Sequence, residues 1–225
     1  MGKPLQKEKL ITVEEFYKKV PDGQKADLID GVIYMASPDS TQQNLLGEFL
    51  VRLMKGYSEI HDLGEVFSSR FAFTLTPYQA PEPDVAFVSK DRLHLVHETG
   101  MRGGPDIAVE IVSKDSKNRD YEDKKRIYQS AGVLEYWIID PIKKKATFYQ
   151  LEEGKYTPVF LESGHLFHSK VLTGFSIDVE WFWMNPLPNI EDKILTYMGK
   201  ERVLKNLIKE MKKEEIQRIL AEEGF

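Results

Sequence analysis

An acidic residue stands inside a segment that otherwise predicts a buried strand. The segment PDIAVEIVS spans residues 105–113, and strand alternation places Glu110 on the same face as Ala108 and Val112. An ionised carboxylate is costly to bury unless a cation accompanies it. Glu110 therefore indicates either an ion pair with a lysine or a divalent metal site, and Glu110 alone does not decide between them.

A second acidic residue, Asp84, opens the strand that PEPDVAF predicts. Pro81 and Pro83 favour extended backbone just before it. Taken alone, Asp84 is typical of a polar strand start at the rim of a sheet. Together with Glu110, it would supply a second carboxylate at the end of a neighbouring strand.

The segment that follows Glu110 predicts a helix over residues 116–132, which begins near Ser116 and ends at Gly132. Asp120, Lys124 and Tyr128 recur every four residues and therefore share one face of that helix. A surface ion pair would account for the first two. A right-handed crossover, however, returns such a helix over the sheet, where Lys124 could reach Glu110.

Two carboxylates and one lysine in this arrangement suit the hydrolysis of a phosphodiester. Carboxylate oxygens bind Mg²⁺, and the metal polarises the phosphoryl group and lowers the pKa of a bound water. The lysine orients that water or stabilises the developing negative charge. We therefore expect Asp84 and Glu110 to bind Mg²⁺ or Mn²⁺ and Lys124 to assist the water.

The remaining pattern predicts the elements that position these residues. Helices are expected over 12–20 with Thr12 as N-cap, and over 41–57 after Ser40. Residues 91–103 predict an irregular surface segment. The segments with strand character are 25–37, 65–77, 81–89, 106–113, 134–141, 143–161 and 164–183. This order favours an α/β fold with a mixed central sheet that helices flank on both faces.

The last forty residues differ from the rest of the chain. We expect a globular domain over residues 1–185 and a helical C-terminal extension over residues 186–225. An amphipathic helix that docks on the domain or on a partner copy explains the extension best. A basic nucleic-acid-binding tail is the alternative, and the interspersed glutamates weigh against it.

The composition limits the class of protein. The 225 residues carry a net charge of −5, which gives no overall basic field for passive coating of DNA. Cysteine is absent, so disulfides and thiolate metal sites are excluded. The first residues lack the apolar core of a signal peptide, and no apolar run has the length of a membrane span. We expect a cytoplasmic protein with no membrane partner.

Several of these motifs together resemble a known family. PEPDVAFV, GPDIAVEIVS, the helix with Asp120, Lys124 and Tyr128, and AGVLEYWIIDP occur in the order of the Uma2 family, as does LIDGVIYMASP before them. These bacterial proteins are assigned as endonucleases with the restriction-endonuclease-like fold of the PD-(D/E)XK superfamily. The resemblance covers residues 12–182. It implies a metal-dependent endonuclease that acts on nucleic acid, expected to be DNA, and a homodimer would suit double-strand cleavage.

The resemblance also implies roles for individual residues. Asp84 and Glu110 are similar to the family's metal-binding acids. The superfamily usually has its lysine two residues after the second acid, where this chain has Val112, and the family instead has it on the next helix, here Lys124. Asp120 and Tyr128 match the positions that flank this lysine.

Other matches and departures concern the surroundings of that site. Asp27 stands where the family commonly has glutamate, which implies a further acidic member of the site. Gln42 replaces a family histidine, and Lys114 and Lys125 are rival candidates for the working lysine. A catalytically inactive module that binds nucleic acid or protein on the same scaffold is the alternative function.

Overall fold

The structure is a computed structural model that describes residues 9–199 and residue 218. Contacts within the chain divide it into two compact units, Met1–Leu187 and Pro188–Phe225. The described part of the second unit contains the helix α4 (Ile190–Met198), which Asn189 caps. The apolar positions predicted further along the C-terminal extension lie outside the described residues.

The first unit is built on a mixed sheet of six strands. Their order across the sheet is β11-β10-β9-β8-β5-β3, and β8 and β9 run parallel while the other neighbours are antiparallel. The six strands are β3 (Gly64–Ser68), β5 (Val85–Ser89), β8 (Ile107–Ile111), β9 (Glu135–Asp140), β10 (Lys145–Glu152) and β11 (Lys155–Pro158).

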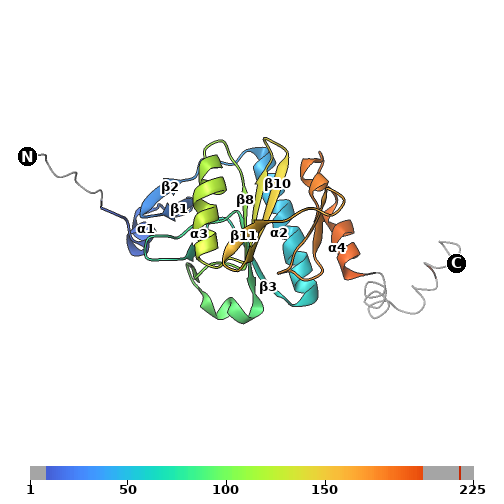
Figure 1. The fold of residues 1–225 in the computed structure, drawn as a ribbon, viewed down its shortest axis with the longest axis horizontal. Coiled ribbons are helices and arrows are strands. Elements are labelled where there is room, and N and C mark those ends of the chain that lie inside the picture. The colour runs from blue at the N-terminus through green and yellow to red at the C-terminus, as the bar shows by residue number, and fades with distance from the viewer. Residues whose placement is uncertain (1–8, 200–217, 219–225) are drawn as a thin grey trace, which may run out of the picture. The chain divides into compact units, whose positions relative to one another are not determined.

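Helices cover both faces of this sheet (Figure 1). The helix α2 (Thr41–His61) packs against β3, β5 and β8. On the opposite face, Tyr128 of α3 (Lys125–Ser130) packs in one cluster with Ala108 of β8 and Tyr136 of β9. The predicted α/β fold with a flanked mixed sheet is therefore confirmed.

Capping side chains define where the first two helices begin. In α1 (Val13–Lys19), the side chain of Thr12 accepts a hydrogen bond from the Glu15 amide, and in α2 Ser40 plays the same part. Both N-caps were expected from the sequence and are confirmed. The helix α2 runs four residues further than predicted and ends at Asp62, whose φ of 54° breaks the helical path.

Three small sheets surround the central one. One sheet pairs β1 (Ala26–Ile29) with β2 (Val32–Met35), and another pairs β12 (Leu166–His168) with β13 (Ser176–Asp178). In the third, β7 (Gly100–Arg102) lies between β4 (Ala72–Thr74) and β6 (Val96–His97). The two-strand predictions for residues 25–37 and 143–161 are confirmed by β1–β2 and β10–β11. Two 3₁₀ segments complete the unit, Lys90–Leu95 and Val179–Trp183.

The secondary structure predicted for residues 65–77 and for residues 91–103 was wrong. Residues 65–77 form two strands in different sheets, because Arg70 adopts a φ of 71° and turns the chain between them. Residues 91–103 are not irregular but contain a 3₁₀ segment and two short strands. Gly100 permits this arrangement, because a Cβ there would lie 2.5 Å from the carbonyl oxygen of Ala72 on the paired strand.

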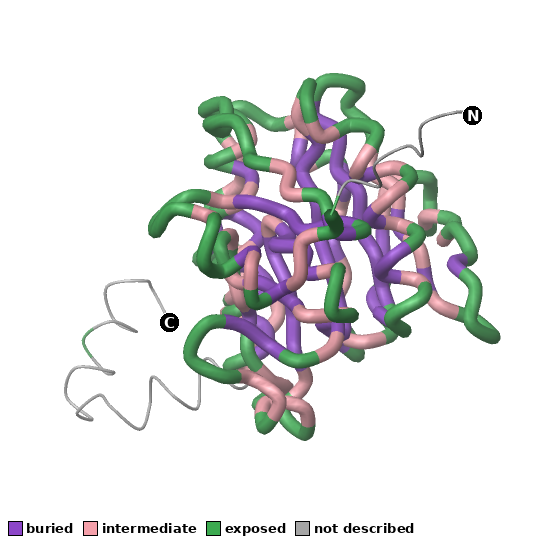
Figure 2. The backbone as a smooth tube through the Cα atoms, turned by 90° about the vertical axis from the view of Figure 1, so that its left-hand side faces the viewer, coloured by how far each residue is buried: buried purple, intermediate pink, exposed green. Residues whose placement is uncertain are grey.

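The core of the first unit lies along the central strands (Figure 2). Every residue of β8 and of β9 is buried, so a charged side chain on either strand needs partners inside the protein. In the described ranges, 9–199 and 218, the helices lack the combination of length and apolar character that a membrane crossing requires.

Candidate active site

The antiparallel pairing of β5 with β8 sets the two predicted acids side by side. Val85 pairs with Val109 and Ala86 with Ala108, so one further step of the same register places Asp84 opposite Glu110. Directly opposed residues on neighbouring strands have Cβ atoms about 5 Å apart and point to the same face. The amide of Ile111 also donates a hydrogen bond to Oδ2 of Asp84 at 2.6 Å.

Lys124 lies in the centre of an acidic cluster. Its Nζ is 2.8 Å from Oε2 of Glu110 and 2.9 Å from Oδ2 of Asp27, and its side chain is only 2% exposed. Asp120 lies slightly further away, with Oδ1 at 3.7 Å from the same nitrogen. Burial lowers the pKa of Lys124, but these carboxylates raise it by more, to well above the ordinary lysine value.

Glu110 is buried and both of its oxygens are partnered. Oε2 faces Lys124, and Oε1 accepts a hydrogen bond from the hydroxyl of Tyr128 at 2.9 Å. Burial raises the pKa of Glu110 to about 8, and Lys124 opposes that rise. Glu110 is thus shielded from water, and this loss of hydration disfavours its charged form.

A π-helical turn (η2, Arg119–Lys124) precedes α3 and carries Asp120 and Lys124. The predicted helix begins at residue 117, directly after Ser116 as expected, but a π turn interrupts its α-helical path at residues 119–124. The carbonyl of Ser116 accepts the amide of Asp120 at 2.9 Å, and the hydroxyl of Ser116 donates to Oδ2 of Asp120. Asp120, Lys124 and Tyr128 are all buried, as their spacing predicts. Wide turns of this kind recur at functional sites.

Asp120 carries an oxygen that the described residues leave without a hydrogen bond. Its Oδ1 is buried and accepts no hydrogen bond in the described part of the chain, and Nζ of Lys124 lies 3.7 Å away as an ion-pair partner. Burial raises the pKa of Asp120 to about 6, while Lys124 and the hydroxyl of Ser116 lower it. The cluster could therefore accept further positive charge at this point.

Two members of the cluster were missed by the sequence analysis. Lys25, just before β1, forms an ion pair with Oδ1 of Asp84. Glu82 is buried beside it, where its Oε2 accepts the amide of Ala26 and burial raises its pKa to about 7. The position of Lys25 directly before the strand that carries Asp27 was the one signal in the sequence.

The rival lysines lie elsewhere. Nζ of Lys125 lies 4.1 Å from the centre of the Tyr149 ring. Lys114 is exposed at the edge of a separate cavity of about 350 Å³, which Gln42 also lines. Of the three candidates, Lys124 is the one whose Nζ contacts Glu110.

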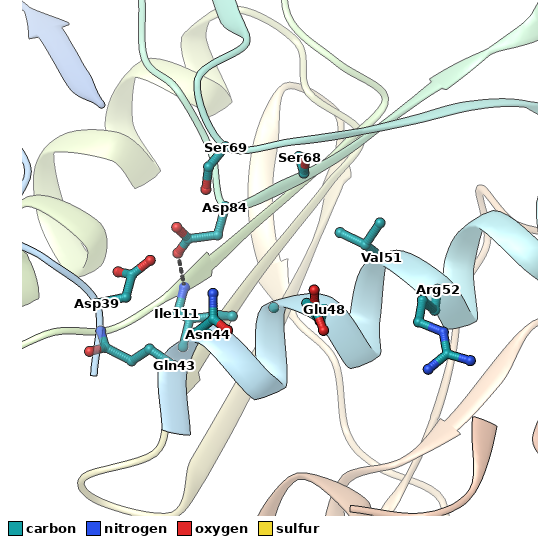
Figure 3. Close-up of a pocket in the computed structure, with 11 residues that line it drawn as sticks. Asp39, Gln43, Asn44, Glu48, Val51, Arg52, Ser68, Ser69, Asp84 and Ile111 are labelled. Atoms are coloured by element: carbon teal, nitrogen blue, oxygen red, sulfur yellow. Dashed lines mark hydrogen bonds between the residues drawn. The ribbon is translucent and has the colours of Figure 1, made fainter. Parts of the chain in front are cut away.

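Cavities of different size meet at Asp84. A small one of about 40 Å³ is lined by Asp84, Glu110 and Lys124, among others. Figure 3 shows Asp84 again at the wall of a more open cavity of about 330 Å³, opposite Gln43 and Asn44 of α2. Asp84 is 14% exposed, whereas Glu110 is 2% exposed, so Asp84 is the acid at the mouth of the cluster.

The donor set can be compared with what a divalent cation requires. Carboxylate oxygens are the ligands that Mg²⁺ and Mn²⁺ prefer. The small cavity is lined by six acids and three cations: Asp27, Asp39, Asp84, Glu110, Asp115 and Asp120 against Lys25, Arg119 and Lys124. Glu82 is buried next to it, and its amide donates to Oδ1 of Asp27. Within residues 9–199 and 218, no three acidic or histidine side chains are arranged as a ready cation site. The donor type, the excess of acids over cations and the Asp120 oxygen that lacks a hydrogen bond fit a cation, which Asp84 and Glu110 could hold.

Solved structures include one with a similar fold. A crystal structure described as "a putative nuclease belonging to DUF820", from Anabaena variabilis ATCC 29413, superposes with a TM-score of 0.64. The match covers 84% of this chain and 99% of the other, at 13% sequence identity, so it supports the fold alone. No curated protein matches the chain significantly.

The family comparison agrees with the fold and with the order of the motifs. The sequence model of the Uma2 family, described as "Putative restriction endonuclease", matches residues 13–180. That range contains both acids, both lysines and the π turn of the cluster. Because the match spans well over half of the sequence, the chain belongs to the Uma2 family.

Proposed function

We propose that this chain is a divalent-cation-dependent endonuclease that hydrolyses phosphodiester bonds in DNA. The observation that supports the proposal most is that Asp84 and Glu110, opposite each other on paired strands, line a small cavity together with Lys124. The family and the fold give the nuclease class. The cation and the DNA substrate are the further steps that we propose.

In this proposal the two acids hold the cation and the other side chains hold the acids. A bound Mg²⁺ or Mn²⁺ supplies Lewis-acid polarisation of the phosphoryl group. Lys124 fixes one oxygen of Glu110, and Tyr128 fixes the other. Asp27 and Asp120 in turn hold the ammonium of Lys124, which makes Lys124 a positioning residue in this arrangement.

The reaction itself exchanges one phosphorus–oxygen bond for another. The oxygen of an attacking water bonds to phosphorus, and the bond from phosphorus to the sugar oxygen breaks. The proton that the water loses balances the proton that the departing sugar oxygen gains. Asp84 is the acid that an incoming phosphate meets first, because it is more exposed than Glu110. A homodimer and a cytoplasmic location remain predictions, the first because twofold symmetry suits cleavage of two strands.

The test combines nicking of a supercoiled plasmid with calorimetric titration of Mn²⁺. Wild-type protein should nick the plasmid in Mg²⁺ or Mn²⁺ and stop when EDTA is added. Asp84→Ala and Glu110→Ala should abolish nicking and Mn²⁺ binding, whereas Asp62→Ala, an exposed acid on the same fold, should change neither. Nicking that persists in both site variants at the wild-type rate would refute the proposal.

A second candidate function has its own observation. Each proposed cation ligand already faces a lysine, Asp84 with Lys25 and Glu110 with Lys124. Such internally neutralised acids also suit a catalytically inactive module that binds nucleic acid on this scaffold. That candidate predicts a wild-type chain that binds duplex DNA but neither takes up Mn²⁺ nor nicks the plasmid.

A further inference from the structure

Lys25 and Lys124 both face the acidic cluster, but they differ in access to solvent. The side chain of Lys124 is 2% exposed, whereas that of Lys25 is 18% exposed. Of the two lysines, Lys25 is therefore the one with the greater access to the surface of the protein.

The ammonium of Lys124 already faces three buried carboxylates. A lysine ammonium has three N–H donors, and the carboxylates of Asp27, Glu110 and Asp120 surround this one within 3.7 Å. Contact with a phosphate would require it to leave a buried carboxylate behind, which is strongly unfavourable. Lys124 therefore fits the role of a buried residue that positions the surrounding carboxylates.

Lys25 lies where the buried cluster opens to the surface. It lines the small cavity together with Asp84 and Glu110, and it also lines an open cavity of about 510 Å³. Among the described residues, Asp84 is its one ion-pair partner. Its backbone carbonyl accepts the amide of Ala36 at 3.0 Å, so the hairpin of β1 and β2 fixes its position.

The charge around Lys25 also suits an anion at this cavity. Lys25 is a cation whose ammonium pairs with Asp84 at the wall of the small cavity. Arg70, an exposed residue, lines the same open cavity and donates a hydrogen bond to the carbonyl of Gly23 at 3.1 Å. Two cations, Lys25 and Arg70, and one acid, Asp39, thus border a surface cavity that adjoins the proposed site.

We propose that Lys25, rather than Lys124, is the lysine that contacts the phosphodiester of the substrate. Its ammonium donates to a non-bridging phosphate oxygen from the open cavity while it stays beside Asp84. The inference rests on the proposed function, because it assumes that nucleic acid is the ligand.

The test measures binding of a labelled DNA duplex across a salt series in EDTA, so that hydrolysis does not contribute. The logarithm of the binding constant falls linearly as the logarithm of the salt concentration rises. Each lost phosphate contact makes this slope shallower by about 0.9, which corresponds to about eightfold weaker binding at 0.1 M salt. Lys25→Met should show this change. Lys90→Met removes a lysine that is paired with Asp62 at the other end of β5, and it should leave the slope unaltered.

A second pair of variants guards against loss of folding. Lys25→Met leaves Asp84 unpaired and could unfold the chain, which circular dichroism would reveal. Asp84→Asn and Lys25→Met/Asp84→Asn differ in the lysine alone and contain no unpaired acid at this point. The double variant should show the lower slope and the single Asn variant should not.

The outcomes separate the two proposals. The inference is overturned if the salt slope of Lys25→Met equals that of the wild type, or if that of the double variant equals that of Asp84→Asn. In either case the wild type still binds and nicks DNA, so the proposed function is not affected. A wild-type chain that binds no duplex overturns both proposals. A slope lowered by about one in the Lys25 variants and unchanged in Lys90→Met supports the inference.

Discussion

Replacement of Lys124 by methionine removes the one cation that three buried carboxylates share. The side chains of Asp27, Glu110 and Asp120 are between 1% and 8% exposed, so water cannot take the place of the ammonium. Loss of one partner from a buried ion pair destabilises a protein by about 3–5 kcal/mol. Each kcal/mol lowers the melting temperature of a domain of this size by about 2–4 °C, so we expect a fall of about 6–20 °C.

The loss of stability should be larger at high pH. Burial raises the pKa of Glu110 to about 8 and Lys124 lowers it, so loss of the lysine raises it further. A carboxyl group whose pKa is higher in the folded than in the unfolded state stabilises the folded protein in its protonated form. This stabilisation is lost as pH rises from the unfolded pKa of 4.5 through the folded pKa. Above pH 8 the wild-type carboxylate keeps its lysine and the variant carboxylate does not.

The assay is urea denaturation followed by circular dichroism at pH 6 and pH 9. Lys90→Met is the control, because its ion pair with Asp62 is 58% and 80% exposed and such pairs contribute about 0–1 kcal/mol. Adding Glu110→Gln to Lys124→Met should restore part of the lost stability at pH 9. A Lys124 variant that is no less stable than the control, or whose deficit shrinks at pH 9, would refute this account of the cluster.

Two further predictions concern buried carboxylates. Tyr128→Phe removes the hydroxyl that donates to Glu110 and should lower the free energy of unfolding at pH 9 by about 1.5–3 kcal/mol. The control is Tyr156→Phe, which removes a hydroxyl that donates to the uncharged carbonyl of Val133 and should lower it by only about 0.5–1.5 kcal/mol. Equal losses would contradict the expectation. Both oxygens of Glu135 accept hydrogen bonds, Oε2 from Trp137 and Ser169 and Oε1 from the backbone amide of Lys170. Glu135→Gln replaces one of these oxygens by an NH₂ that faces a donor in either orientation. It should destabilise the chain by about 2–3 kcal/mol in the same urea assay, against no measurable change for exposed Glu98→Gln.

The main members of the cluster could be anticipated because local periodicity identifies them. Strand alternation put Glu110 on the face of Ala108, which packs against α3, and the spacing of four put Lys124 on the face of Tyr128. The same spacing does not distinguish an α turn from a π turn, so the helix type was missed. Whether these residues act on a phosphate is a separate matter that the proposed assays address.

Other features depend on contacts between distant segments. Lys25 and Asp84 are separated by 59 positions, and nothing in the local pattern around Lys25 distinguishes it from a lysine on a turn. The strand alternation of residues 65–77 likewise continues through Arg70, although the backbone changes direction there. The first feature depends on how the β1–β2 hairpin lies beside β5, and the second on the pairing of β4 with the distant β7, and neither is contained in one segment read alone.

The charge distribution explains how an acidic chain could still meet a polyanion. The net charge of −5 is an overall sum, whereas a phosphate near the surface responds to charges within about 8–10 Å at physiological salt. Behind the surface, the buried acids outnumber the lysines. At the open cavity, Lys25 and Arg70 are the cations that a ligand would meet first. An acidic composition therefore excludes a protein that coats DNA through a broad basic face, but it does not exclude one that binds phosphate at a single narrow site.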